Sequence, residues 1–194
     1  MGKTLFVLAS KSPRRKELLK NIGIDACIMP ANIDEDLFIG LPPEKMVKEL
    51  SMLKAMDVAR SFKKDTYVIG ADTVVCVDGE IFGKPEDDKE AREMLKKLSG
   101  RSHEVYTGYC VVYCKSGVSV AKSEKTTVYF RNLSDEEIEA YVRTREPMDK
   151  AGAYGIQQQG SKFVERIEGD YFNVVGLPVC ALVKLMKEEF DINI

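Results

Sequence analysis

The chain has 194 residues, and its 44% hydrophobic content is enough for a sizeable core in one domain, or in one domain with a lobe. Its 29 Lys and Arg residues against 31 Asp and Glu give a net charge of −2, which argues against a protein that grips nucleic acid by bulk charge. No stretch resembles a secretory signal or a membrane span, so we expect a soluble cytoplasmic protein with a single domain over residues 1–194.

The first predicted unit is a strand, a hydroxyl-rich turn and a helix. Residues 4–10 form a short apolar run, and Ser12 and Pro13 are typical of the cap and first position of a helix that ends at Gly23. The three cations at 14–16 add positive charge to a helix N-terminus, which costs about 0.3–1 kcal/mol each unless an anion binds there. The stretch therefore indicates either a phosphate site or a solvated basic helix face.

The remaining elements follow from periodicity and turn residues. Apolar residues at helical spacing, with a capping box at Ser134 and Glu137, predict further helices over 42–62, 87–100, 134–142 and 179–190. Strand-like runs predict turns between strands at Asp78-Gly79, Ser116-Gly117 and Glu168-Gly169. The glycine-rich segment 148–160 is predicted to be a loop. Interspersed strands and helices with hairpins predict an α/β fold with a mixed sheet, and any lobe division is expected near residues 30 and 150.

The cysteine and histidine content argues against zinc and multi-histidine sites. The only histidine, His103, has no Cys or Ser neighbour arranged as a nucleophile. The five cysteines include no CxxC pair, so we expect buried, reduced thiols. They are Cys27, Cys76, Cys110, Cys114 and Cys180.

Asp72 is the most informative single residue. It lies in the otherwise apolar run 68–77, where an unpaired carboxylate would cost on the order of several kcal/mol to bury. It either caps a turn after Gly70 or serves as a metal ligand or general base at a strand end. The acidic cluster 34–36 alone is typical of a solvated turn, but it could supply a second oxygen ligand for a divalent ion shared with Asp72.

Three lysines differ from the ordinary surface set. Lys54 lies at the margin of an apolar helix stripe, Lys84 precedes Pro85 at the end of a strand, and Lys150 opens the glycine-rich loop. Each alone is more typical of a side chain that reaches into solvent. Together with the arginines at 14 and 15, they are five cations that could converge on one polyphosphate.

The glycine-rich loop also carries a candidate base reader. Gln157 offers an amide donor and acceptor, and Gly152, Gly155 and Gly160 allow backbone donors to face a ligand. A flexible polar loop is the alternative interpretation of the three glutamines at 157–159. Neither a Walker-type nor a Rossmann glycine motif is present.

Taken in order, these motifs resemble the Maf family of nucleoside triphosphate pyrophosphatases over essentially the whole chain. The matching motifs are LASKSPRRKELL (8–19), Asp34-Glu35, Glu49 to Ala55, GADT (70–73), GKP (83–85) and DKAGAYGIQ (149–157). The SPRR, ADT and AYGIQ forms resemble the branch that acts on dTTP and UTP rather than the branch that acts on 7-methyl-GTP. One departure is Gln158, where relatives commonly have glycine.

The resemblance implies a central mixed β-sheet flanked by helices, in two lobes with an active-site cleft, as in Maf and ITPase folds. It implies hydrolysis of dTTP and UTP to the monophosphate and pyrophosphate, which would limit misuse of surplus or non-standard pyrimidine nucleotides. The expected cofactor is a divalent cation, Mg²⁺ first, with Mn²⁺ or Co²⁺ as alternatives. The expected partner is the nucleoside triphosphate. No nucleic acid or membrane partner is expected. The resemblance is compatible with a homodimer.

The resemblance also assigns roles to residues. Asp72 is the expected catalytic proton acceptor, and Glu35 and Asp72 are the expected metal ligands. Specificity residues are expected at Arg14, Thr73 and Gln157. The expected phosphate-binding residues are Ser10, Arg14, Arg15, Lys54, Lys84 and Lys150.

Two functions from other classes remain as alternatives. A nucleotide-sensing regulator of cell division and septum formation, without significant turnover, would need the phosphate site but not the buried Asp72. An RNA-binding module would need a broad basic face, which the net charge of −2 disfavours.

Overall fold

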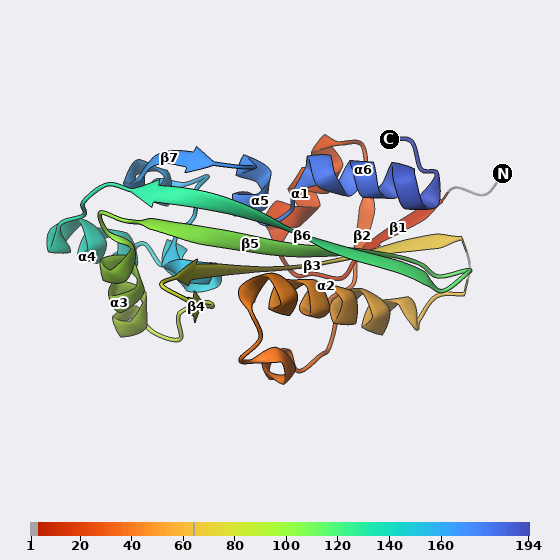
Figure 1. The fold of residues 1–194 in the computed structure, drawn as a ribbon, viewed down its shortest axis with the longest axis horizontal. Coiled ribbons are helices and arrows are strands. Elements are labelled where there is room, and N and C mark those ends of the chain that lie inside the picture. The colour runs from red at the N-terminus through yellow and green to blue at the C-terminus, as the bar shows by residue number, and fades with distance from the viewer. Residues whose placement is uncertain (1–3, 64) are drawn as a thin grey trace. The chain divides into compact units, whose positions relative to one another are not determined.

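The computed structural model describes residues 4–63 and 65–194, which form an α/β fold (Figure 1). The strands are β1 (Leu5–Leu8), β2 (Ala26–Ile28), β3 (Thr66–Val77), β4 (Glu80–Phe82), β5 (Ser102–Tyr113), β6 (Val118–Phe130) and β7 (Val164–Glu168). The α-helices are α1 (Pro13–Asn21), α2 (Pro43–Ala59), α3 (Asp88–Leu98), α4 (Asp135–Arg143), α5 (Tyr171–Val175) and α6 (Val179–Phe190). Short 3-10 turns lie at η1 (Glu35–Phe38), η2 (Glu146–Asp149), η3 (Ala151–Ala153) and η4 (Gln159–Phe163).

The strands form one mixed sheet. Their order is β2-β1-β3-β5-β6-β7, and β4 pairs with β3. Strand β1 is parallel to both of its neighbours, so that Val7 lies opposite Cys27 on one side and Val68 on the other. The pairs β3/β4 and β6/β7 are antiparallel. This arrangement confirms the mixed sheet that the sequence predicts.

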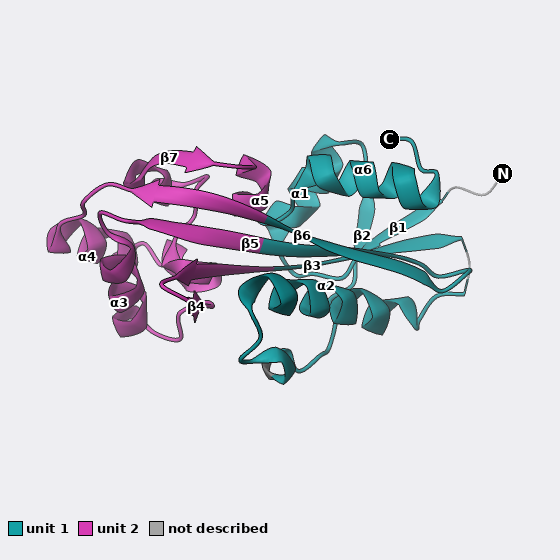
Figure 2. Ribbon diagram, viewed as in Figure 1, with its two compact units in different colours: residues 1–72, 107–124, 176–194 teal, residues 73–106, 125–175 magenta. Residues whose placement is uncertain are grey.

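The chain divides into two compact units, coloured separately in Figure 2. Unit 1 contains Met1–Asp72, Thr107–Glu124 and Gly176–Ile194, and unit 2 contains Thr73–Tyr106 and Lys125–Val175. Three boundaries fall inside β3, β5 and β6, and the fourth lies between α5 and α6, so none is near residues 30 and 150 as expected. The chain crosses these three boundaries within continuous strands, so no turn or linker marks them in the sequence.

In unit 1, helix α2 packs unusually close to the sheet. A Cβ on Gly70 of β3 would lie 2.2 Å from the Ser51 carbonyl oxygen, and one on Gly108 of β5 would lie 2.0 Å from the Val47 carbonyl oxygen. Only glycine at these positions lets the helix backbone come so near. The close approach brings Lys54, three residues after Ser51, beside β3.

Unit 2 has its own hydrophobic core beneath α3 and α4. It includes Leu95 and Leu98 of α3, Ile138 and Tyr141 of α4, and Phe163. The amphipathic pattern that predicted both helices is confirmed. The Asp87 side chain caps α3, and both hydrogen bonds of the predicted capping box of α4 are present.

Several local predictions were wrong. Strand β2 was missed because its three residues are too few to show a period. The hairpin expected about Glu168-Gly169 does not form, because β7 pairs with β6 and is followed by helix α5, whose Phe172 amide donates to Asp170 Oδ1 at 2.8 Å. Segment 148–160 includes short 3-10 turns rather than loop alone.

All five cysteines are free, but not all are buried as expected. Cys76 and Cys110 are buried, whereas Cys27 and Cys180 are exposed. Burial raises the pKa of the Cys110 thiol to about 12, so it stays protonated.

Within the described residues, no helix combines the length and apolar character needed to cross a membrane.

Candidate active site

The N-terminal turn of α1 is organised around serine hydroxyls. Ser12 caps the helix and accepts from the Arg15 amide at 3.5 Å, and the Ser12 amide donates to Ser10 Oγ at 3.2 Å. No acidic residue lies in the first turn to balance the cations. The predicted cap is confirmed. The positive charge at the N-terminus of α1 is not compensated by a carboxylate in the first turn of the helix.

The Arg15 side chain folds back onto this turn instead of extending into solvent. Its Nε donates to the Gly176 carbonyl oxygen at 2.8 Å, and its Nη1 donates to Ser10 Oγ at 3.0 Å. Burial lowers the pKa of the Arg15 guanidinium, with a smaller contribution from Arg14, and this outweighs the opposing effect of Asp72 and Glu35. Arginine nevertheless remains protonated at physiological pH, so the turn holds a fixed, partly desolvated cation.

Lys54 pairs with two carboxylates at once. Its Nζ lies 2.6 Å from Asp72 Oδ1 and 2.7 Å from Glu35 Oε1. The Lys54 and Asp72 side chains are 12% and 11% exposed, whereas Glu35 is 60% exposed. Asp72 lies in the interior of β3, so neither the predicted turn cap nor the predicted strand-end position is found. The partner that a buried carboxylate requires is Lys54.

The Glu35 and Asp72 carboxylates fit a divalent cation. One oxygen of each carboxylate contacts the Lys54 ammonium, so both carboxylates already surround a single positive charge. Among the residues the structure describes, no group of three or more His, Cys, Asp or Glu could enclose a metal on its own. Magnesium commonly binds through one or two carboxylates and completes its shell with water and substrate phosphate, so the donor set suits that ion.

Four expected site residues belong to unit 2. Thr73 follows Asp72 in β3 and is half-buried, Lys84 is exposed just after β4, and Gln157 is exposed. Lys150 differs from the others because it is only 6% exposed. Its ammonium donates to Asp149 Oδ1 at 2.6 Å and to the Glu146 carbonyl oxygen at 2.7 Å.

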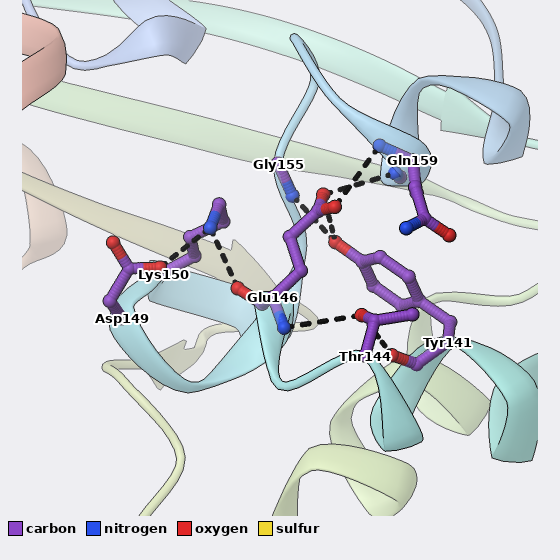
Figure 3. A network of polar contacts seen from close by, with 8 residues as sticks. Tyr141, Thr144, Glu146, Asp149, Lys150, Gly155 and Gln159 are labelled. Atoms are coloured by element: carbon purple, nitrogen blue, oxygen red, sulfur yellow. Dashed lines mark hydrogen bonds and ion pairs between the residues drawn. The ribbon is translucent and has the colours of Figure 1, made fainter.

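The sequence did not point to the polar network around Tyr141 and Glu146 (Figure 3). Tyr141 lies in the predicted helix over 134–142, and its side chain is fully buried. Its hydroxyl, however, donates to Glu146 Oε1 at 2.8 Å and accepts from the Gly155 amide at 3.1 Å. A buried tyrosine hydroxyl needs such partners, which is the signal that could have prompted a search near the glycine-rich loop.

Comparison with known families decides the relationship. Residues 5–189 match the family model described as Maf-like protein. The chain belongs to the Maf family. The resemblance inferred from the sequence motifs is thereby confirmed.

Relatives of this Maf protein match along nearly their whole length. A protein of Alkaliphilus oremlandii named dTTP/UTP pyrophosphatase is 50% identical over 189 residues, which cover 97% of this chain and 98% of that protein. A protein of the same name from Thermosipho africanus is 55% identical over 174 residues, covering 90% and 87%. Another from Clostridioides difficile is 47% identical over 189 residues, covering 97% of each.

A solved structure supports the fold class. The Ham1 protein of Staphylococcus aureus aligns with a TM-score of 0.53 at 15% identity, over 95% of this chain and 98% of that one. At this identity the likeness concerns the fold alone. It confirms the predicted α/β architecture of this Maf protein.

Proposed function

We propose that this Maf protein is a nucleoside triphosphate pyrophosphatase that hydrolyses dTTP and UTP to the monophosphate and pyrophosphate. The observation that carries the proposal is the cluster in which Lys54 joins Asp72 and Glu35, near enough for both carboxylates to act on Arg15. Cations at a helix N-terminus beside two metal-compatible carboxylates match the needs of a polyphosphate and its metal ion. The relatives' shared name supports the same activity.

The first turn of α1 is proposed to bind the polyphosphate. Ser10, Arg14 and Arg15 would contact phosphate oxygens together with the amides of the helix N-terminus. Lys84, which is exposed just after β4, is proposed as a further phosphate ligand. Charge-assisted hydrogen bonds of this kind are about twice as strong as neutral ones, so they can offset the charge of a triphosphate.

Glu35 and Asp72 are proposed to hold the divalent cation, with Mg²⁺ as the first choice and Mn²⁺ or Co²⁺ as alternatives. The bound ion would neutralise phosphate charge and make a water molecule more acidic. Lys54 now occupies the space between the two carboxylates, so it must turn away when a cation binds there. It would then be available as a further phosphate ligand.

Asp72 is proposed to accept the proton of the attacking water. The oxygen of that water would form a bond to the α phosphorus, and the bond from the α phosphorus to the α–β bridging oxygen would break, so that pyrophosphate leaves with this oxygen and its bonding electron pair. A positioned carboxylate typically contributes about 10²–10⁴-fold to such a proton transfer. The low exposure of the Asp72 side chain and its position inside β3 limit the orientations that its carboxylate can take.

The pyrimidine base is proposed to be read by Gln157, with Arg14 and Thr73 as the other specificity residues. Uracil and thymine present carbonyl acceptors on either side of one N–H donor, and an amide side chain can match both kinds of group. In the cell, this activity would limit misuse of surplus or non-standard pyrimidine nucleotides. Five free cysteines support the cytoplasm as the compartment, because thiols stay reduced there.

The test is steady-state hydrolysis of each triphosphate by the purified protein with Mg²⁺, with pyrophosphate and phosphate measured separately. We expect pyrophosphate release, with UTP and dTTP well ahead of ATP and GTP. A regulator that only senses nucleotides would bind UTP without releasing pyrophosphate, and that result would overturn the proposal. Equal turnover of purine and pyrimidine triphosphates would overturn the assignment to the dTTP and UTP branch, and Gln158 would be the first residue to examine.

A further inference from the structure

The loop of residues 155–160 has an exposed tip, residues 157–159, and two buried ends, Gly155 and Gly160, which together we call its neck. A Cβ on Gly160 would lie 2.7 Å from the Gly155 carbonyl oxygen and 2.8 Å from the Tyr141 hydroxyl. The two ends of the loop therefore meet backbone to backbone at the Tyr141 hydroxyl, with no room for a side chain between them.

Tyr141 and Glu146 bind both ends of this neck (Figure 3). The Tyr141 hydroxyl accepts from the Gly155 amide at 3.1 Å and donates to Glu146 Oε1 at 2.8 Å. The same carboxylate accepts from the amides of Gln159 at 3.1 Å and Gly160 at 3.3 Å. Burial raises the pKa of Tyr141, so its hydroxyl stays protonated and keeps the donor role toward Glu146.

Lys150 supports the neck through its alkyl chain. A Cβ on Gly155 would lie 2.6 Å from Lys150 Cε and 3.3 Å from Glu146 Oε1, so the loop backbone lies against both residues. The Lys150 ammonium donates to the Glu146 carbonyl oxygen and to Asp149 Oδ1. Glu146 is thus fixed through its main chain as well as its carboxylate.

We propose that Tyr141 and Glu146 are positioning residues that set base selectivity by fixing the neck of the loop that presents Gln157. The inference rests on the proposed function, in which Gln157 reads the pyrimidine. Neither Tyr141 nor Glu146 has to touch the nucleotide. Uracil presents the O4 acceptor beside the N3–H donor, whereas cytosine presents an amino donor beside the N3 acceptor, so an amide turned end for end would match cytosine instead of uracil. A loose neck would let the Gln157 amide satisfy either base.

The first experiment measures the neck directly. Hydrogen exchange of the amides at 155–160 is compared in the parent protein, in Tyr141→Phe and in Glu146→Gln. We expect exchange at least about tenfold faster at the Gly155 amide in Tyr141→Phe and at the Gln159 and Gly160 amides in Glu146→Gln, because each variant removes an acceptor of those amides. The matched control is Tyr129→Phe, which removes a Tyr–Glu hydrogen bond of 3.0 Å to Glu168 on an exposed strand pair and should leave the loop unchanged.

The second experiment measures selectivity in the same proteins as the ratio of kcat/KM for UTP to that for CTP. The inference predicts that this ratio falls by at least about fivefold in Tyr141→Phe and Glu146→Gln, while kcat for CTP changes less than the ratio. A role in stability alone would lower all rates together and leave the ratio unchanged. Glu146 is only half-buried, so Glu146→Gln keeps the test valid if Tyr141→Phe folds poorly.

The outcomes separate this inference from the proposed function. A parent protein that releases no pyrophosphate from UTP contradicts the function and the inference with it. A selective parent whose variants keep both their slow exchange and their UTP to CTP ratio contradicts the inference alone. Faster loop exchange with an unchanged ratio likewise overturns the assignment of a selectivity role.

Discussion

His103 should make the stability of this protein depend on pH below neutrality. The ring is 2% exposed, its Nε2 lies 2.8 Å from the Tyr154 hydroxyl oxygen, and it packs edge-on against Phe130 at 4.9 Å between ring centroids. Within the described part of the chain, Nδ1 has no hydrogen-bond partner, so a protonated ring would bury an unsatisfied N–H. Burial accordingly lowers the pKa of His103 from 6.5 to about 3.

The sign and size of the effect follow from linkage. Because the folded pKa is the lower one, the unfolded chain gains a proton below pH 6.5 that the folded protein cannot bind. The stabilisation is present above pH 6.5 and is lost toward pH 3 by about 1.4 kcal/mol per pH unit. Between pH 7.5 and pH 5, His103 alone should therefore cost about 2 kcal/mol, which is about 4–8 °C in Tm for a chain of this size.

The assay is urea denaturation of the parent and of His103→Gln at pH 7.5, 6.5 and 5.0. Glutamine keeps a polar group near the Tyr154 hydroxyl but does not titrate, and all carboxylates are common to both proteins. The free energy of unfolding should fall by about 2 kcal/mol more in the parent than in the variant between pH 7.5 and 5. The same pH dependence of the free energy of unfolding in both proteins would show that His103 is not the titrating group.

Three predictions concern the proposed site. Asp72→Asn should lower kcat at least about 10²-fold with the fold intact by circular dichroism, and retention of more than about a tenth of parental activity would exclude an essential role. Arg15→Lys should lower kcat/KM for UTP by about tenfold or more, because one ammonium cannot keep both contacts of the guanidinium, whereas exposed Lys16→Ala is the control and should change little. Lys84→Ala should raise KM without lowering Tm, since exposed cations contribute little to stability. A lower Tm with unchanged kinetics would instead favour a structural role for that lysine.

The confirmed predictions of local structure depend on short sequence patterns. The cap of α1, the Asp78-Gly79 turn and the capping box of α4 depend on residues within a few positions of one another. Asp78 and Gly79 have φ values of 51° and 80°, the left-handed conformations that this pair favours in tight hairpins. Such features are set by the chain itself and need no knowledge of packing.

For contacts between residues far apart in the sequence, the sequence predicts that a partner must exist but not which residue it is. The need for a partner at Asp72 follows from its apolar neighbours, but Lys54 becomes that partner only because α2 approaches β3 closely at Gly70. The contact between Tyr141 and Gly155 likewise joins residues 14 positions apart, and no repeating sequence pattern links the two. Packing of whole elements decides both contacts, so the sequence pattern alone could not identify them.

³¹P NMR of UTP hydrolysis by the purified protein with Mg²⁺ would test most decisively whether the protein is a pyrophosphatase that uses Asp72. The pyrophosphatase assignment predicts that UTP resonances are replaced by those of UMP and pyrophosphate, with no UDP or phosphate, and that Asp72→Asn shows almost no conversion. Formation of UDP and phosphate, or no conversion by the parent protein, would contradict it.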